Sequence, residues 1–197
     1  MLLRKYQWLT SAAAAMSLLA ASVATADEWV RRSFEVAGVK DAHLTFEYPL
    51  SWGKKPAYKT FDNVTDVEFG PYGPRSKPFF LVQLQSVPTV DPVNAEQLDQ
   101  IAEVEISQLA KAAFESEIPV NTLQGEHNNV RYFSITDKVK RWGEFDYLTM
   151  AIIGSGNLLT KCYFFSSDGA PDFGADAIRM LESIRYTPPP VDPEEED

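Results

Sequence analysis

Residues 147–153, Tyr147-Leu148-Thr149-Met150-Ala151-Ile152-Ile153, carry apolar side chains at both odd and even positions. Successive side chains of a strand point to opposite faces, so this strand is apolar on both faces and is normally covered on both. The tetrapeptide Gly154-Ser155-Gly156-Asn157 is typical of a tight hairpin and leads into a second strand-like run at residues 158–166. The sequence therefore predicts an antiparallel sheet with a layer on each side.

Two amphipathic segments can supply those layers. The first begins at Asn94-Ala95-Glu96-Gln97, a capping-box pattern, and ends near Ser116. Its apolar side chains form one stripe when projected as a helix: Leu98, Ile101, Ala102, Ile106, Leu109, Ala112 and Ala113. The second runs from Asp172 to Tyr186, and it also has an apolar face: Phe173, Ala177, Met180, Leu181 and Ile184. We expect one helix on each face of the sheet, an α/β/α sandwich of the mixed α+β class.

The remaining segments predict further strands of the same sheet. They cover residues 44–48, 61–69 and 79–87 before the first helix, and residues 120–125, 130–138 and 144–153 after it. A short edge strand is expected within residues 29–36. Residues 27–187 are therefore predicted to form a single α/β domain.

The two ends of the chain have different compositions. Residues 1–26 combine Arg4 and Lys5, an apolar run of about ten residues and the small-residue exit Ala24-Thr25-Ala26, which is typical of a secretory signal peptide. The alternative is an uncleaved amphipathic anchor. The apolar run is too short for a permanent span, which needs about twenty residues. Residues 188–197 contain four prolines and five acids and predict a disordered tail. We expect a periplasmic or secreted protein with no integral membrane span after signal removal.

Charge and cysteine content exclude several classes of protein. A net charge of −10 and a pI near 4.7 give no general attraction to nucleic-acid phosphate, so no nucleic-acid partner is expected. The single cysteine, Cys162, cannot form an internal disulfide, and its apolar neighbours predict a buried thiol. The domain must then be stabilised by its core.

Two short segments resemble a known superfamily. Residues 46–52, Phe46-Glu47-Tyr48-Pro49-Leu50-Ser51-Trp52, and residues 180–186, Met180-Leu181-Glu182-Ser183-Ile184-Arg185-Tyr186, are similar to the superfamily of PsbP and the Ran-binding Mog proteins, which has bacterial secreted members of unknown role. The resemblance covers residues 44–186. It implies an α/β/α sandwich with an antiparallel sheet and a mostly non-enzymatic role as a partner or assembly protein. It identifies no binding residue, because both segments are core signatures.

Motifs for metal, phosphate or covalent chemistry are missing from the sequence. His43 and His127 are the two histidines, and they lack metal-ligand spacing. Gly154-Ser155-Gly156 lacks the spacing of a hydrolase nucleophile elbow, and residues 62–66 lack the glycine and terminal glutamate of a calcium loop. We therefore expect neither a metal ion nor a cofactor.

Glu105 is the candidate catalytic residue, because it projects into the apolar stripe of the first helix. A buried carboxylate must be paired, hydrogen-bonded or protonated. It is either a site acid or a structural ion pair at the helix edge. In both cases we expect a partner from a neighbouring strand, such as an Arg, a Lys, a Tyr hydroxyl or a backbone amide.

The candidate binding residues are Lys138, Lys140, Arg141 and Trp142, with Arg131 nearby in sequence. Basic side chains beside a tryptophan suit an anionic partner, lipid headgroup or glycan, although charged hairpin tips are also common because they are wet. We expect a secreted or periplasmic, non-enzymatic binding or assembly protein whose partner is a protein or another envelope component. The alternatives are a small hydrolase or isomerase using Glu105, with a pocket that joins it to a second titratable group, or a lipid or small-hydrophobe carrier with an apolar cavity.

Overall fold

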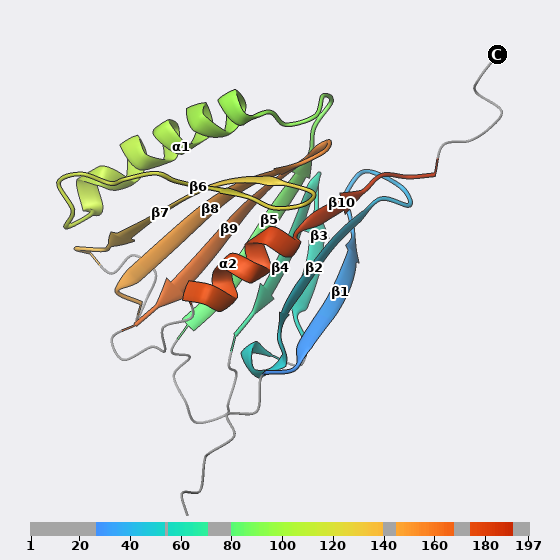
Figure 1. The fold of residues 1–197 in the computed structure, drawn as a ribbon, viewed down its shortest axis with the longest axis horizontal. Helices are drawn as coiled ribbons and strands as arrows, with labels where there is room; N and C mark the ends of the chain where they lie inside the picture. Colours follow the sequence, from blue (N-terminus) through green and yellow to red (C-terminus); the bar gives the residue numbers. More distant parts are fainter. Residues whose placement is uncertain (1–26, 54, 71–79, 140–144, 168–173, 191–197) are drawn as a thin grey trace, which may run out of the picture.

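The computed structural model describes residues 27–53, 55–70, 80–139, 145–167 and 174–190 (Figure 1). Within them the strands are β1 (Trp29–Glu35), β2 (His43–Pro49), β3 (Ala57–Phe61), β4 (Val64–Phe69), β5 (Phe80–Pro88), β6 (Asn121–Gln124), β7 (Asn129–Thr136), β8 (Tyr147–Ser155), β9 (Leu158–Ser166) and β10 (Arg185–Thr187). The helices are α1 (Ala95–Leu109) and α2 (Gly174–Ser183), with short 3-10 turns η1 (Leu50–Trp52) and η2 (Ala110–Ala112). The fold is a mixed α+β fold, mostly antiparallel sheet.

The strands form two sheets where the sequence predicted one. The larger sheet has seven strands in the order β3-β4-β5-β9-β8-β7-β6, and the smaller has three in the order β1-β2-β10. Every pairing is antiparallel. In Figure 1 the smaller sheet lies at the right and α1 at the upper left.

Local signals in the sequence correspond to local structure at several places. The Asn94 side chain accepts a hydrogen bond from the Gln97 amide, and the Gln97 side chain accepts one from the Asn94 amide, both at 2.9 Å. The helix predicted to end near Ser116 ends earlier, at Leu109, and the short 3-10 turn η2 follows it directly. The predicted hairpin joins β8 to β9, with Gly156 in the left-handed region at a φ of 54°. Asp172 and Phe173, expected at the start of the second helix, lie outside the described residues. The expected end at Tyr186 is wrong, because the helix ends at Ser183 and residues 185–187 pair with β2 as β10.

The single strand predicted at residues 61–69 is wrong. The chain turns at Asp62 and Asn63, so that Phe61 pairs with Val64 in a hairpin of β3 and β4. Asp62 has a φ of 49°, a left-handed conformation that aspartate tolerates better than most residues. The period-two apolar pattern concealed a turn inside it.

The core consists of two clusters, and β8 contributes to both. Leu148, Met150 and Ile152 pack in one cluster with Leu98 and Ala102 of α1. The alternate residues of β8, Ala151 and Ile153, belong to the other cluster. That cluster also contains Leu44, Phe46 and Tyr48 of β2, Cys162 and Phe164 of β9, and Met180 and Leu181 of α2. The two apolar faces read from residues 147–153 are thus both buried. No helix in the described part of the chain has the length and apolar character needed to cross a membrane.

Candidate functional site

Glu105 lies at the junction of α1 and β9. Its carboxylate accepts a hydrogen bond from Lys161 Nζ at 2.5 Å, and its side chain is 17% exposed. Tyr163 lies two residues after Lys161, on the same face of β9. Burial, together with the negative charge of Glu105, raises the pKa of the Tyr163 hydroxyl to about 12. The expected partner from a neighbouring strand is present, and it neutralises the carboxylate.

A second ion pair also ties α1 to the sheet. Arg131 of β7 donates to both carboxylate oxygens of Asp99, from Nε at 2.5 Å and from Nη2 at 3.3 Å. The hydrogen bond and charge of Arg131 hold the pKa of Asp99 below its usual value. Arg131 is buried and occupied by Asp99, so it does not extend the basic cluster near which the sequence places it.

The predicted basic binding cluster is described only in part. Lys138 is exposed, with its ammonium 5.6 Å from the centre of the Phe114 ring. Lys140, Arg141 and Trp142 lie outside the described residues.

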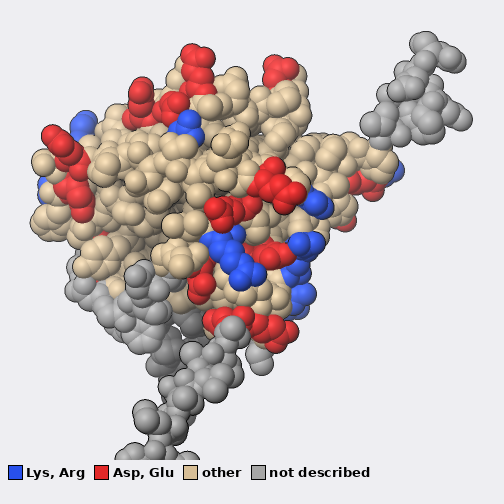
Figure 2. Space-filling view, viewed as in Figure 1, with Lys and Arg blue, Asp and Glu red and all other residues tan. Residues whose placement is uncertain are grey.

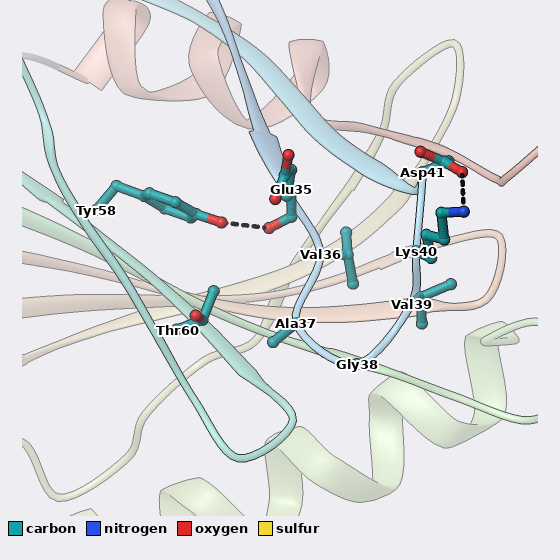
Figure 3. A pocket seen from close by; sticks show the side chains of 9 residues that line it. All are labelled: Glu35, Val36, Ala37, Gly38, Val39, Lys40, Asp41, Tyr58 and Thr60. Atoms are coloured by element: carbon teal, nitrogen blue, oxygen red, sulfur yellow. Dashed lines mark hydrogen bonds and ion pairs between the residues drawn. The ribbon is translucent and has the colours of Figure 1, made fainter.

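A cleft of about 630 Å³ lies between β3 and the loop that joins β1 to β2 (Figure 3). Tyr58 and Thr60 form one wall, and residues 35–41 form the other. The Tyr58 hydroxyl donates to the Glu35 carbonyl at 3.0 Å, while Lys40 and Asp41 form an exposed ion pair at 3.9 Å. The Tyr58 hydroxyl, Lys40 and Asp41 thus have their partners within the lining of this cleft.

A smaller cleft of about 240 Å³ gathers more charged groups. Its lining comes from one face of the three-stranded sheet, from the loop between β6 and β7 and from the end of α2: Arg31, Thr45, Glu47, Glu126, His127, Glu182, Ser183 and Arg185. Register places Arg31 opposite Glu47 and Arg185 opposite Thr45. One buried side chain fixes the loop from β6 to β7 against α2, because Asn128 Nδ2 donates to the carbonyls of Leu181, Glu182 and Ile184 at 2.8, 3.3 and 2.6 Å.

Two arginines, Arg31 and Arg179, lie at the Glu47 carboxylate, and Arg185 lines the same cleft from β10; we call Arg31, Arg179 and Arg185 the arginine cluster. Arg31 donates to Glu47 Oε1 from Nε at 3.0 Å and from Nη2 at 2.6 Å, and Arg179 Nη2 lies 3.9 Å from Oε2. The Arg179 guanidinium is stacked 3.8 Å from the centre of the Trp29 ring. Arg185 has no ion pair with any residue that the structure describes.

The arginine cluster is accessible to solvent. The side chains of Arg31 and Arg179 are 70% and 55% exposed. Figure 2 shows basic side chains gathered over α2, β1 and β2, with acidic ones between them. Sequence reasoning missed this site because its three arginines are on β1, α2 and β10, which are far apart in the sequence. They come close only because β1 and β10 both pair with β2 and α2 packs against β2. The alternation of Trp29, Arg31 and Ser33 along β1 was the one local signal of a polar sheet face.

The smaller cleft does not contain a prepared nucleophile. The Ser183 hydroxyl donates to the Met180 carbonyl at 2.7 Å and accepts from the Glu47 amide at 2.8 Å, so it holds α2 against β2. His127 lies 3.7 Å from the carboxylate of its neighbour Glu126. Among the described residues, no three His, Cys, Asp or Glu side chains are grouped as metal ligands would be. The arrangement can bind charged groups, chiefly through the arginines.

Comparisons with known proteins give no family. No family model matches the chain, and no curated protein matches it. A solved structure from Bacteroides thetaiotaomicron is similar at 13% sequence identity with a TM-score of 0.39. The similarity covers 73% of this chain and 45% of that protein, so this chain spans less than half of its length.

Proposed function

We propose that this chain is a non-enzymatic binding or assembly protein that acts in the periplasm or after secretion, with a protein or another envelope component as its partner. The observation that supports this most is the arginine cluster with Trp29 beside it. Arginine and tryptophan are enriched among the residues that contribute most to protein interfaces, because they combine a large contact area with directed hydrogen bonds.

The position of Glu105 argues against the enzymatic alternative. A hydrolase or isomerase using Glu105 needs a concave pocket that joins it to a second titratable group. Glu105 is instead neutralised by Lys161 at the edge of α1, and it lines neither of the two clefts described above. The carrier alternative finds no support in these clefts either, since one is bounded by loop main chain and the other by charged side chains.

We also propose that the layers form the α/β/α sandwich of the PsbP and Mog superfamily. The support comes from the core, where α1 and α2 belong to different clusters and β8 contributes alternate residues to each. Residues of both resembling segments, such as Phe46, Tyr48, Met180 and Leu181, are buried together. A solved structure with both helices against the same cluster would contradict this proposal.

Site-specific photocrosslinking tests the binding function. A crosslinking amino acid at Ser33, which is two residues from Arg31 on the same face of β1, is compared with one at Glu103 on the exposed side of α1. We expect a discrete crosslinked product in the native envelope from position 33, lost when Arg31 and Arg185 are changed to alanine, and none from position 103. Equal products from both positions, or products that persist without the two arginines, would contradict a binding site at the arginine cluster.

A further inference from the structure

The outer edge of β1 has no strand partner in the part of the chain that the structure describes. The smaller sheet runs β1-β2-β10, so β1 pairs with β2 on one side and its other edge is left open. The strand is seven residues long. An open edge of this length is a template on which an extended peptide can add a further strand.

Cationic side chains flank this edge on both faces. Arg31 and Arg32 are consecutive residues of β1 and project to opposite faces, and both are exposed. The arginine cluster lies on the face of Arg31, where Trp29 holds the Arg179 guanidinium in place. A neutral or basic strand would have to approach these charges without compensation, whereas an acidic strand would gain from them.

The cluster already binds one carboxylate, namely that of Glu47. Arg31 donates two N–H groups to one oxygen, Oε1, by charge-assisted hydrogen bonds of the kind that guanidinium groups make to carboxylates. Arg179 Nη2 lies 3.9 Å from the same group, beyond hydrogen-bond distance. Donors on Arg179 are thus available for a further carboxylate.

Acidic residues mark the ends of the cationic section. Asp27 and Glu28 precede β1, and Glu35 ends it. An acidic peptide is therefore repelled at both ends and attracted in the middle. This favours a short extended segment placed against residues 29–33.

We propose that the open edge of β1 and the arginine cluster together bind an extended, carboxylate-rich peptide segment of a partner protein. The segment adds a strand beside β1 through main-chain hydrogen bonds, and its alternate Glu or Asp side chains contact Arg31 and Arg179, which lies against Trp29 of β1. This inference rests on the proposed binding function and specifies the chemistry of its partner.

The test uses the chain from residue 27 to residue 197 and a capped peptide of about nine residues in which Glu alternates with Thr, measured by fluorescence anisotropy. One matched peptide has Lys in place of Glu, and another carries N-methyl groups on alternate amides. The first removes the carboxylates, and the second removes main-chain hydrogen bonds but keeps the charge. The variants are Arg31→Ala and Arg179→Ala, with Lys111→Ala on exposed η2 as a control of equal charge change.

We expect the Glu peptide alone to bind measurably. Either arginine substitution should raise Kd about tenfold, as loss of one charge-assisted contact does, while Lys111→Ala changes it less than about twofold. Arg179→Ala keeps the test decisive if Arg31→Ala, which leaves Glu47 without its main partner, fails to fold. Hydrogen exchange of the β1 amides should slow on binding.

Several results would overturn the inference. Equal binding of the N-methylated peptide would leave only charge attraction, and equal losses in Lys111→Ala would remove the role of the cluster. A chain ending at residue 190 that binds the Glu peptide more than about tenfold more tightly than the chain to residue 197 would assign the site to this chain's own acidic tail. If residue 33 crosslinks in an arginine-dependent way but the peptide does not bind, the binding function stands and this inference fails.

Discussion

Tyr48 presents an unpaired hydroxyl to the larger core cluster. The side chain is fully buried, its ring centre lies 4.7 Å from that of Phe69, and no described residue is within hydrogen-bond distance of its oxygen. Burial of a hydroxyl without a partner costs about 1–3 kcal/mol. Tyr48→Phe is therefore expected to increase the free energy of unfolding by about 1 kcal/mol in urea denaturation.

The matched control for that substitution is Tyr58→Phe. The Tyr58 hydroxyl donates to the Glu35 carbonyl at 3.0 Å, so its removal should leave stability unchanged or lower it by up to about 1 kcal/mol. If Tyr48→Phe is the less stable of the two, the Tyr48 hydroxyl has a partner, such as an internal water.

Cys162 is expected to be inert in the folded protein. It is fully buried, and this burial raises the pKa of its thiol well above the ordinary value. A disulfide reagent at pH 8 should therefore label it only at the rate of unfolding, and at once in concentrated urea. Because the folded-state pKa is raised, the contribution of this thiol to stability is complete below about pH 8.5 and declines as the pH rises further. Rapid labelling of the native protein would contradict the buried position.

At the level of helices and strands, the sequence predicted whatever depends on neighbours in the chain. The capping box at Asn94 and the turn at Gly156 are formed by residues within three or four positions of one another, and both are present. The turn at Asp62 was missed because Phe61, Thr65 and Val67 continue an apolar alternation across it. Strand β10 was missed because its three residues have no pattern of their own and pair with distant β2.

The residues of the candidate site show the same difference between local signals, which the sequence reveals, and long-range contacts, which it does not. The helical projection placed Glu105 toward the sheet, but its partner Lys161 lies 56 positions away and follows from strand register. The arginine cluster joins residues of β1, α2 and β10, and no periodicity within one segment can reveal it. Charge alone favoured residues 138–142 because they are adjacent in sequence.

The Glu105–Lys161 pair is expected to anchor the C-terminal half of α1. Glu105→Gln should lower the free energy of unfolding by about 1 kcal/mol, and the double variant with Lys161→Met should show a coupling of similar size, measured by urea denaturation. The pKa of Tyr163, raised first by burial and then by the charge of Glu105, should fall in Glu105→Gln.

The control for this pair is Asp99→Asn, which breaks the other ion pair of α1 and should not couple to Lys161. A Glu105→Gln variant that keeps its stability but loses partner binding would show that Glu105 has a functional role. No measurable coupling would show that the pair is too well solvated to contribute.

Across the whole molecule, stability comes from two apolar clusters that share one sheet. Cys162 is the single cysteine, so no internal disulfide assists them. This places the polar sites on the margins of the sheets, where β1 and α2 leave side chains exposed. The arginine cluster lies at such a margin. Because Arg31 is near the start of β1, the cluster is also close in sequence to the expected cleavage site after Ala26.

Cleavage after Ala26 is expected to produce a mature chain that begins at Asp27, only two residues before Trp29 and the arginine cluster. The Ser51 hydroxyl donates to the Asp27 carboxylate, and the Leu50 amide donates to the Glu28 carbonyl at 2.7 Å, so the first residues of the mature chain would be held against η1. N-terminal sequencing of protein from the envelope fraction should therefore return Asp27-Glu28-Trp29. Replacing Ala24 and Ala26 with leucine removes the small residues that the peptidase requires and should leave the uncleaved chain with the membranes, whereas Ala21→Leu, within the apolar run, should be processed normally. Recovery of an intact Met1 from soluble envelope protein would contradict the signal peptide, and it would leave 26 further residues next to the edge where the partner segment is proposed to bind.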